Sequence, residues 1–232
     1  MQRKKIDIMV CSSFSGGSAV FKNLIFLTLI FLVSCANQVR DVKYKTYELV
    51  GIEKRDLFKR EINNVKDEQE DSKEAFSDAL EKLQHFYSFD GGKIEKEYKK
   101  LKSSYENSQS EAKDLSESIT KLDTVAQDLF KEWKNEIGTM ENANLKKDSS
   151  KKLKETQDKY ASLHKKLKNS EKKMSPILSK LKDQVTYLKH NLNASAIAGL
   201  KSEGDRIEAD MGKLIQEMKE ASREADDFIS TL

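Results

Sequence analysis

IEKEYKKLKSSYENSQSEAKDLSESITKLDTVAQDLFKEW, from Ile94 to Trp133, is the stretch that decides the fold. Apolar residues recur along it in steps of four and three, and most of the positions between them are charged or small and polar. This spacing predicts an α-helix with a narrow apolar seam along one side. A repeat of about 3.5 residues sustained over this length is typical of helices that wrap around one another. The seam consists of Ile94, Tyr98, Leu101, Tyr105, Ser108, Ala112, Leu115, Ile119, Leu122, Ala126, Leu129 and Trp133.

Three other stretches have the same rhythm. One precedes this seam and consists of Phe58, Ile62, Val65, Gln69, Ser72, Phe76, Ala79, Leu83 and Phe86. Another runs from Leu153 to Leu181 and then shifts onto Val185, Leu188 and Leu192, and the last runs from Leu200 to Phe228. Charged residues make up 35% of the chain and there is one proline, a composition that favours long exposed helices. We therefore predict an all-α fold, an elongated antiparallel helical bundle or coiled coil of three to four long helices over residues 52–232.

The interruptions between the seams predict the turns. Two glycines in SFDGG, Ser88–Gly92, indicate a short reversal that makes the first two helices antiparallel neighbours. We place the second turn near Asn142–Asn144, where Asn and Ser residues offer helix caps. The third boundary stays open, because Asn193 either caps a new helix or lies within a continuing one. Pro176 falls inside a helical pattern, where it kinks the helix unless a helix begins there.

The N-terminal region has the pattern of a secretory signal. Leu24–Val33 is an apolar run of ten residues, too short to span a membrane comfortably, and it follows several basic residues. The four residues that close it, Leu32-Val33-Ser34-Cys35, resemble the bacterial lipobox, whose cysteine is acylated and becomes the new N-terminus. We predict a signal peptide at residues 1–34, with a misassigned start if translation begins at Met9 or Val20, and a lipidated Cys35 followed by a tether over residues 35–51.

Two alternatives remain for Cys35. In the first, Cys35 is a buried structural cysteine. In the second, it belongs to a signal anchor that is not cleaved. A disulfide with Cys11 is incompatible with cleavage, because Cys11 lies upstream of the cleavage point.

The charge balance changes when the signal is removed. The chain carries 42 Lys+Arg and 39 Asp+Glu, and residues 1–35 hold four of the basic and one of the acidic residues, which leaves 38 of each. The remaining protein is neutral, so the sequence pI of about 8.6 is no sign of nucleic-acid binding.

The residue types that build catalytic or metal sites do not occur in suitable patterns. His85, His164 and His190 are far apart, and no His-x-x-x-His, Cys-x-x-Cys or glycine-rich phosphate motif occurs. We expect no catalytic residue, no metal, no cofactor and no small-molecule substrate. The seam aromatics Tyr98, Tyr105, Tyr160 and Trp133 are interpreted as core residues.

Polar residues within the seams are candidates for a register layer. Gln69 and Ser72 lie about as far before the Ser88–Gly92 turn as Ser108 lies after it, so the reversal brings all three to a similar height. A buried polar layer most simply fixes helix register. A binding niche is the alternative.

Several stretches together resemble an uncharacterised bacterial envelope family catalogued as domain of unknown function 2959. They are GIEKRDLF (Gly51–Phe58), FDGGKIEKEYKKL (Phe89–Leu101), LFKEW (Leu129–Trp133) and DQVTYLKHNLNASAIAGL (Asp183–Leu200). The resemblance implies an all-helical, lipid-anchored protein of a Gram-negative bacterium and carries no known activity or catalytic residue. Within its densest match we predict an interaction surface, unless these residues only build the third turn: Tyr187, Lys189, His190, Asn191 and Asn193.

These observations favour a non-enzymatic, lipid-anchored coiled-coil protein that faces the periplasm and acts as a structural or protein-binding module. Ala36, rather than Asp, follows the cysteine, which favours the outer membrane. The expected partners are the membrane, through the lipid, and a protein or a second copy of the chain, with no nucleic acid. The alternatives are a chaperone-like or adaptor protein that holds a client along an opening seam, and an intracellular coiled-coil scaffold.

Overall fold

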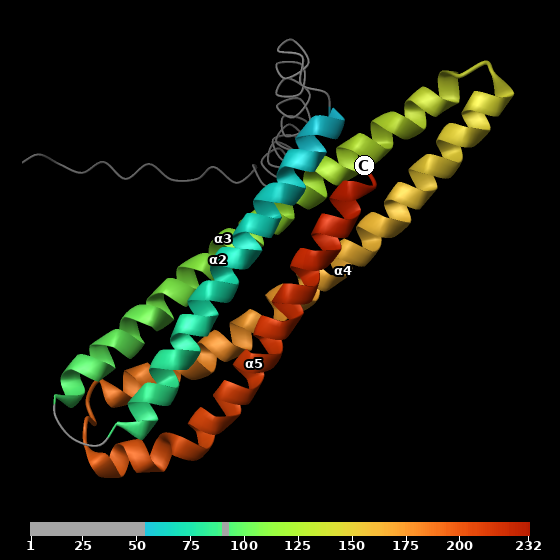
Figure 1. Cartoon of the computed structure of the whole chain (residues 1–232). Coiled ribbons are helices and arrows are strands. Elements are labelled where there is room, and N and C mark those ends of the chain that lie inside the picture. The colour runs from blue at the N-terminus through green and yellow to red at the C-terminus, as the bar shows by residue number, and fades with distance from the viewer. Residues whose placement is uncertain (1–53, 90–92) are drawn as a thin grey trace, which may run out of the picture. The chain divides into compact units, whose positions relative to one another are not determined.

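Four long helices make up the part of the chain that the computed structural model describes, residues 54–89 and 93–232. They are α2 (Lys54–Ser88), α3 (Ile94–Thr139), α4 (Ala143–Leu188) and α5 (Ala194–Ser230). Successive helices reverse direction and form a ring in which α2 packs on α3 and α5, and α4 packs on the same two (Figure 1). The predicted all-α antiparallel bundle is confirmed, with four helices.

The predicted signal peptide, Cys35 and the tether lie outside the described residues, as do Gly91 and Gly92. The described residues belong to one compact unit, Glu53–Leu232. None of the described helices has a stretch long and apolar enough to cross a membrane.

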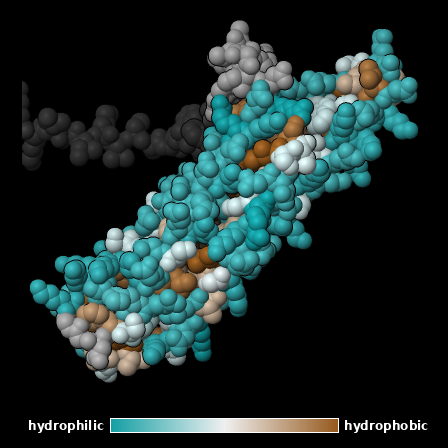
Figure 2. Space-filling view, in the orientation of Figure 1, coloured by the Kyte–Doolittle hydropathy of each residue, from teal (hydrophilic) through white to brown (hydrophobic). Residues whose placement is uncertain are grey.

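The seams form the core of the bundle. Every residue of the α2 seam is buried, and so is the α3 seam from Tyr98 to Leu129, whereas Ile94 and Trp133 at its ends are half-buried. The α5 seam is buried from Gly204 to Phe228. The surface between the seams is dominated by hydrophilic residues, with small apolar patches along the lines between helices (Figure 2). Each helix therefore has one stripe that is removed from water and a wide solvated face.

One aromatic cluster contains a ring from each of the four helices. Phe58 of α2 has no exposed surface, and its ring centroid lies 5.8 Å from Phe130 of α3, 5.6 Å from Tyr160 of α4 and 5.8 Å from Phe228 of α5. All three contacts are edge-to-face, the arrangement that aromatic quadrupoles favour. The cluster joins all four helices at one level of the bundle.

The helix ends agree with the sequence at two of the three turns. Asn193 caps α5, because its side chain accepts a hydrogen bond from the Ala196 backbone N–H at 2.9 Å, so a new helix begins there. Pro176 lies inside a continuous α4. The second turn lies slightly earlier in the chain than Asn142–Asn144, where the sequence predicts it. Asn142 is the N-cap of α4, and the turn comprises Met140–Asn142 because the Asn142 side chain captures the first free backbone N–H groups of that helix.

The α3–α4 hairpin projects beyond the other two helices. Lys54, the first described residue, pairs with Glu132 of α3 at 2.7 Å, so the last turns of α3 and the first turns of α4 extend past the start of α2 (Figure 1). Trp133 donates its indole N–H to Ser149 across this extension at 2.8 Å. Leu145 near the tip is 63% exposed. At about 1.5 Å per residue, the 46 residues of α3 span ~69 Å.

Gly204 allows a close approach between α5 and α2. A Cβ at this position would lie 2.4 Å from Cε2 of Tyr87, whereas nothing lies within 4 Å of a Cβ at Gly212 in the same helix. The Tyr87 hydroxyl donates to Gln184 Oε1 of α4, so the tyrosine ring is held in place and connects three helices.

We expect Gly204→Ala to lower the free energy of unfolding by about 1–3 kcal/mol, because the new methyl group overlaps the Tyr87 ring. Gly212→Ala is the matched control and should raise it by up to about 1 kcal/mol, since alanine has the better helix propensity. Urea unfolding followed by circular dichroism measures both. Equal effects of the two substitutions would contradict the close packing at Gly204.

Candidate binding groove and polar layer

The predicted polar layer joins α2 to α3. The Ser72 hydroxyl donates to the Glu111 carbonyl oxygen at 2.9 Å, and the Ser108 hydroxyl donates to the Ala75 carbonyl oxygen at 3.0 Å. Both serines are buried. These reciprocal bonds fit only one alignment of the two helices, because a shift by one residue would move each hydroxyl away from its carbonyl. The two serines thus bond across the α2–α3 interface, and their role in fixing the helix register stays a prediction.

Gln69 lies at the same level but does not share in this bonding. Its side chain is fully buried, and neither its amide nitrogen nor its oxygen bonds any described protein atom. The contacts Lys66–Asp226 and Gln84–Glu208 set the antiparallel register of α2 and α5 and place Gln69 level with Ser222, whose buried hydroxyl also has no hydrogen-bond partner among the described residues. A buried amide without partners carries the full desolvation cost of its polar atoms.

We expect Gln69→Leu to raise the free energy of unfolding by about 1–3 kcal/mol, because an apolar side chain of similar length removes that desolvation cost. Ser108→Ala is the comparison and should lower it by about 1 kcal/mol, because it deletes an interhelical hydrogen bond. Denaturant unfolding and light scattering measure stability and oligomeric state. A loss of stability in Gln69→Leu would assign this amide the register role that the sequence suggested.

The predicted surface at the α4–α5 turn divides into two kinds of residue. Asn193 caps α5, and Asn191 donates its side-chain amide to the Tyr187 carbonyl oxygen at 3.0 Å, so both asparagines build the turn. Tyr187 is 47% exposed, and Lys189 and His190 are also exposed. The turn accounts for the two asparagines. A role of Tyr187, Lys189 and His190 in binding a partner stays a prediction.

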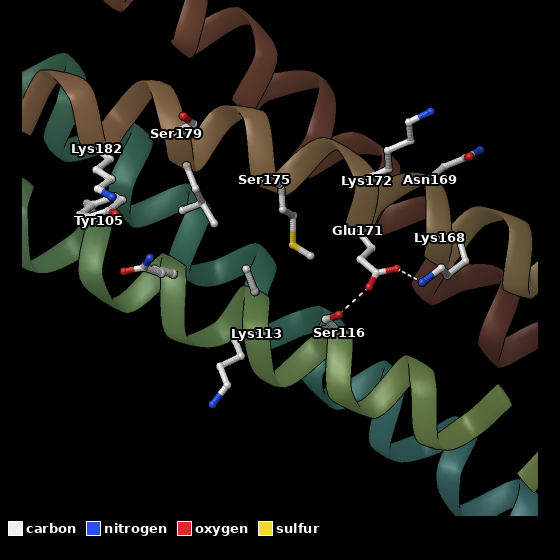
Figure 3. Close-up of a pocket in the computed structure, with 14 residues that line it drawn as sticks. Tyr105, Lys113, Ser116, Lys168, Asn169, Glu171, Lys172, Ser175, Ser179 and Lys182 are labelled. Carbon is white, nitrogen blue, oxygen red and sulfur yellow. Dashed lines mark hydrogen bonds and ion pairs between the residues drawn. The ribbon is translucent and has the colours of Figure 1, made fainter. Parts of the chain in front are cut away.

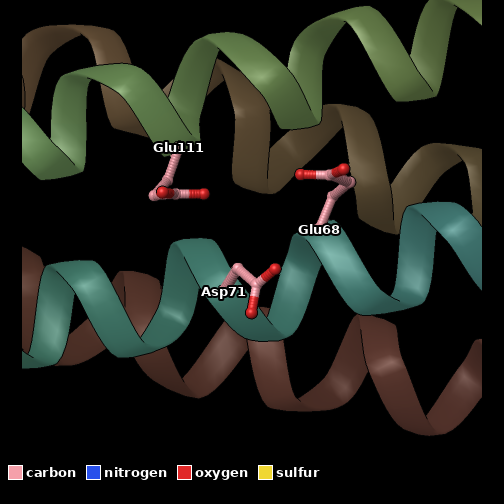
Figure 4. A group of neighbouring side chains, drawn as sticks. All are labelled: Glu68, Asp71 and Glu111. Atoms are coloured by element: carbon pink, nitrogen blue, oxygen red, sulfur yellow. The ribbon is translucent and has the colours of Figure 1, made fainter.

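An acidic cluster lies where α2 faces α3. Glu68 and Asp71 of α2 and Glu111 of α3 point toward one another, with one oxygen of each within 4.8 Å of the others (Figure 4). Burial raises the pKa of the Glu68 carboxyl, and the nearby carboxylates, Asp114 first among them, raise that pKa further. Carboxylate oxygens are the ligands that hard cations prefer. Solvated glutamates and aspartates at this spacing are also common on exposed helices, so the cluster does not define a metal site.

A groove of about 890 Å³ lies between α3 and α4 (Figure 3). Its floor consists of three core side chains, Tyr105, Ala112 and Met174, and of the half-buried Leu178. Its walls carry four lysines: Lys113, Lys168, Lys172 and Lys182. Glu171 is the only acidic residue among the described side chains that line it.

Glu171 is engaged within the groove. It accepts a hydrogen bond from the Ser116 hydroxyl at 2.5 Å and forms an ion pair with Lys168 (Figure 3). Lys182 extends from α4 toward Tyr105 on α3, whereas Lys113 and Lys172 line the groove with their stems and direct their ammonium groups outward (Figure 3). The groove thus combines an apolar floor with a net positive rim.

The positive rim reflects an uneven distribution of charge among the helices. α4 carries 13 lysines and five acidic residues, a net charge of +8, whereas α2, α3 and α5 have net charges of −2, −2 and −4. The total hides this difference, and the sequence prediction, which relied on the total, missed the groove lysines. A charge count for each predicted helix would have identified α4 as the basic one.

The side of α4 that faces α5 has its charges paired across the interface. Lys166 pairs with Glu224 at 2.6 Å and Lys180 with Asp210 at 2.9 Å, and Lys173 pairs with Glu217 between them. Glu224 also accepts a hydrogen bond from the Ser162 hydroxyl at 2.8 Å. The hydrogen bonds from Lys166 and Ser162 hold the pKa of the Glu224 carboxyl below its ordinary value.

A lowered folded-state pKa means that Glu224 stabilises the bundle above the unfolded pKa of about 4.3, and that this stabilisation disappears as the pH falls through the folded value. We expect Glu224→Gln to lower the free energy of unfolding by about 0.5–1 kcal/mol at pH 7 and by progressively less below about pH 4. Urea unfolding over this pH range measures the difference. Glu141→Gln, an exposed residue in the α3–α4 turn, is the control and should have no such effect.

The fold and the distribution of charge define the class of protein: an antiparallel four-helix bundle with a single apolar seam on each highly charged helix. The chain belongs to the family described as "Protein of unknown function (DUF2959)", whose sequence profile matches residues 43–232. The resemblance drawn from the sequence is therefore confirmed. The chain matches no curated protein and no solved structure.

Proposed function

We propose that this chain is a non-enzymatic, lipid-anchored protein of the bacterial cell envelope whose helical bundle acts as a structural or protein-binding module. Cys35 holds the anchor after removal of residues 1–34, residues 35–51 form the tether, and the bundle faces the periplasm from the outer membrane. One observation carries the part of the proposal that concerns the bundle. The seam side chains fill the interior of the described bundle, so the bundle offers other molecules long helical surfaces and the grooves between them.

The position of α2 is compatible with a tether at one end of the bundle. Lys54, where the described helices begin, lies beside Glu132 at the base of the projecting hairpin rather than midway along the bundle. A lipid on Cys35 would precede this point by fewer than 20 residues. Several acyl chains on one cysteine hold a soluble domain far more firmly than a single chain does.

A chaperone-like or adaptor role is the second candidate, because of the buried Gln69. Separating the helices costs less free energy at a seam that contains an unbonded amide than at a fully apolar seam. The reason is that water forms hydrogen bonds with the amide once the seam opens. Hydrogen exchange separates the two candidates. A static module protects the backbone amides around Gln69 as well as those around Phe58, whereas a client-holding seam exchanges faster around Gln69.

The test of the anchor is the intact mass of the protein extracted from the membrane fraction of cells that express the full chain. We expect loss of residues 1–34 and the added mass of acyl chains on Cys35. Cys35→Ser is the matched control and should retain the N-terminal segment without acylation. An unmodified Cys35 in the full-length chain would refute the lipoprotein assignment, and recovery in the cytosol would favour the intracellular scaffold.

The partner is identified by crosslinking in intact cells followed by mass spectrometry. Capture of an envelope protein at Tyr187, Lys189 or His190 would support the predicted surface. Crosslinks between copies of the chain alone would favour a structural role over an adaptor role.

A further inference from the structure

The groove between α3 and α4 has the two properties that an amphiphile requires. Tyr105, Ala112 and Met174 are buried side chains that form an apolar floor, and Leu178 is half-buried beside them. Along α4 the groove runs from Lys168 to Lys182, about 21 Å at the helical rise of 1.5 Å per residue. The groove therefore has an apolar floor along part of its length and a cationic residue of α4 at each end.

Three of the four groove lysines are available to a ligand, since Lys168 pairs with Glu171. Lys172 and Lys182 form no ion pair with any described residue, unlike Lys166, Lys173 and Lys180 on the α5 side of the same helix. Lys113 lies 3.5 Å from Glu117, but these side chains are 74% and 67% exposed, so water and salt screen the pair strongly. Lysine stems also lie along apolar surface while their ammonium groups reach outward.

We propose that this groove binds a single-chain anionic lipid, with its alkyl chain on the floor of Tyr105, Ala112, Met174 and Leu178 and its anionic head among the lysines. This site goes beyond the structural or protein-binding role proposed above, because it adds a small-molecule ligand to the bundle. The lipid covers the apolar surface that the floor still exposes, and its head supplies a negative partner to Lys172 and Lys182, as Glu224 and Asp210 do for Lys166 and Lys180 on the α5 side.

The size of the groove favours a small ligand over a macromolecule. Its volume of about 890 Å³ falls within the range of roughly 300–1,000 Å³ that is usual for small-molecule sites. A stable protein partner would need to bury about 800 Å² on each side, far more than a floor of four side chains supplies. Nucleic acid would use the lysines but has no use for the apolar floor.

The test uses the full chain in phosphatidylcholine vesicles and a long-chain fatty acid that carries a photoreactive diazirine on its alkyl chain. After irradiation, peptide mapping should place the label on residues 105–116 of α3 and 168–182 of α4. The corresponding diazirine fatty alcohol, which lacks the anionic head, should label these segments about tenfold less, the ratio that corresponds to one good charge contact.

Two pairs of variants give matched controls. Lys172→Glu with Lys182→Glu should reduce groove labelling by about tenfold, whereas Lys147→Glu with Lys159→Glu, the same charge change at exposed positions of α4 outside the groove, should leave it unchanged. Leu178→Gln should reduce labelling because it makes the floor of the groove more polar. Leu145→Gln at the hairpin tip should leave labelling unchanged. Thermal unfolding confirms that each variant is folded.

Equal labelling by the acid and the alcohol, or labelling spread evenly along the helices, would overturn the proposal. So would competition by double-stranded DNA as strong as competition by oleate, because it would assign the lysines to phosphate binding without the apolar floor. The acylation of Cys35 is measured on the same sample by intact mass. A negative result for lipid binding in the groove is therefore distinguished from a negative result for the lipid anchor.

Discussion

The narrowness of the apolar seam is the constraint on which the rest of the structure depends. Each helix has one stripe of apolar residues, and a stripe of that width leaves water only when neighbouring helices cover it from both sides. A ring of four antiparallel helices supplies two neighbours to every helix. Phe58 illustrates the result, because its ring meets an aromatic ring from each of the other three helices and is fully buried. The core is therefore long and thin, and its stability is distributed along the seams.

Charge adds a second level of organisation to this bundle. α4 has a net charge of +8, and on its α5 side Lys166 and Lys180 meet acidic residues across the interface. On its α3 side α4 contributes three lysines and one glutamate to the groove, and the glutamate pairs with only one of these lysines, Lys168. The same helix therefore uses its charge for packing on one side and presents it to solvent on the other. This asymmetry connects the fold to the proposed lipid site, because unpaired cations beside an apolar floor are suited to an anionic amphiphile.

Local sequence signals predicted where the helices begin and end. The surroundings of individual side chains depend on non-local packing and could not be predicted in this way. Asn142 and Asn193 act as N-caps through short-range hydrogen bonds, which depend on a few consecutive residues. Trp133 at the end of its seam is instead half-buried and donates its indole N–H to Ser149 of the next helix, a contact that exists only once α3 and α4 pack together. The seam pattern placed Gln69 in the core, but it could not show that the amide finds no partner there, because that depends on how the other helices pack around it.

The sequence by itself determined the fold class, the four seams and the register candidates Ser72 and Ser108, because helical periodicity and turn chemistry act over short separations. It also predicts a signal peptide and a lipidated Cys35, which lie outside the described residues. Only the tertiary structure decided that Gly204 admits the Tyr87 ring, and that Lys168 and Lys182 share a groove with Tyr105 and Ala112. The physical reason is that a groove is a property of two helices together: its floor and rim exist only once α3 and α4 lie side by side.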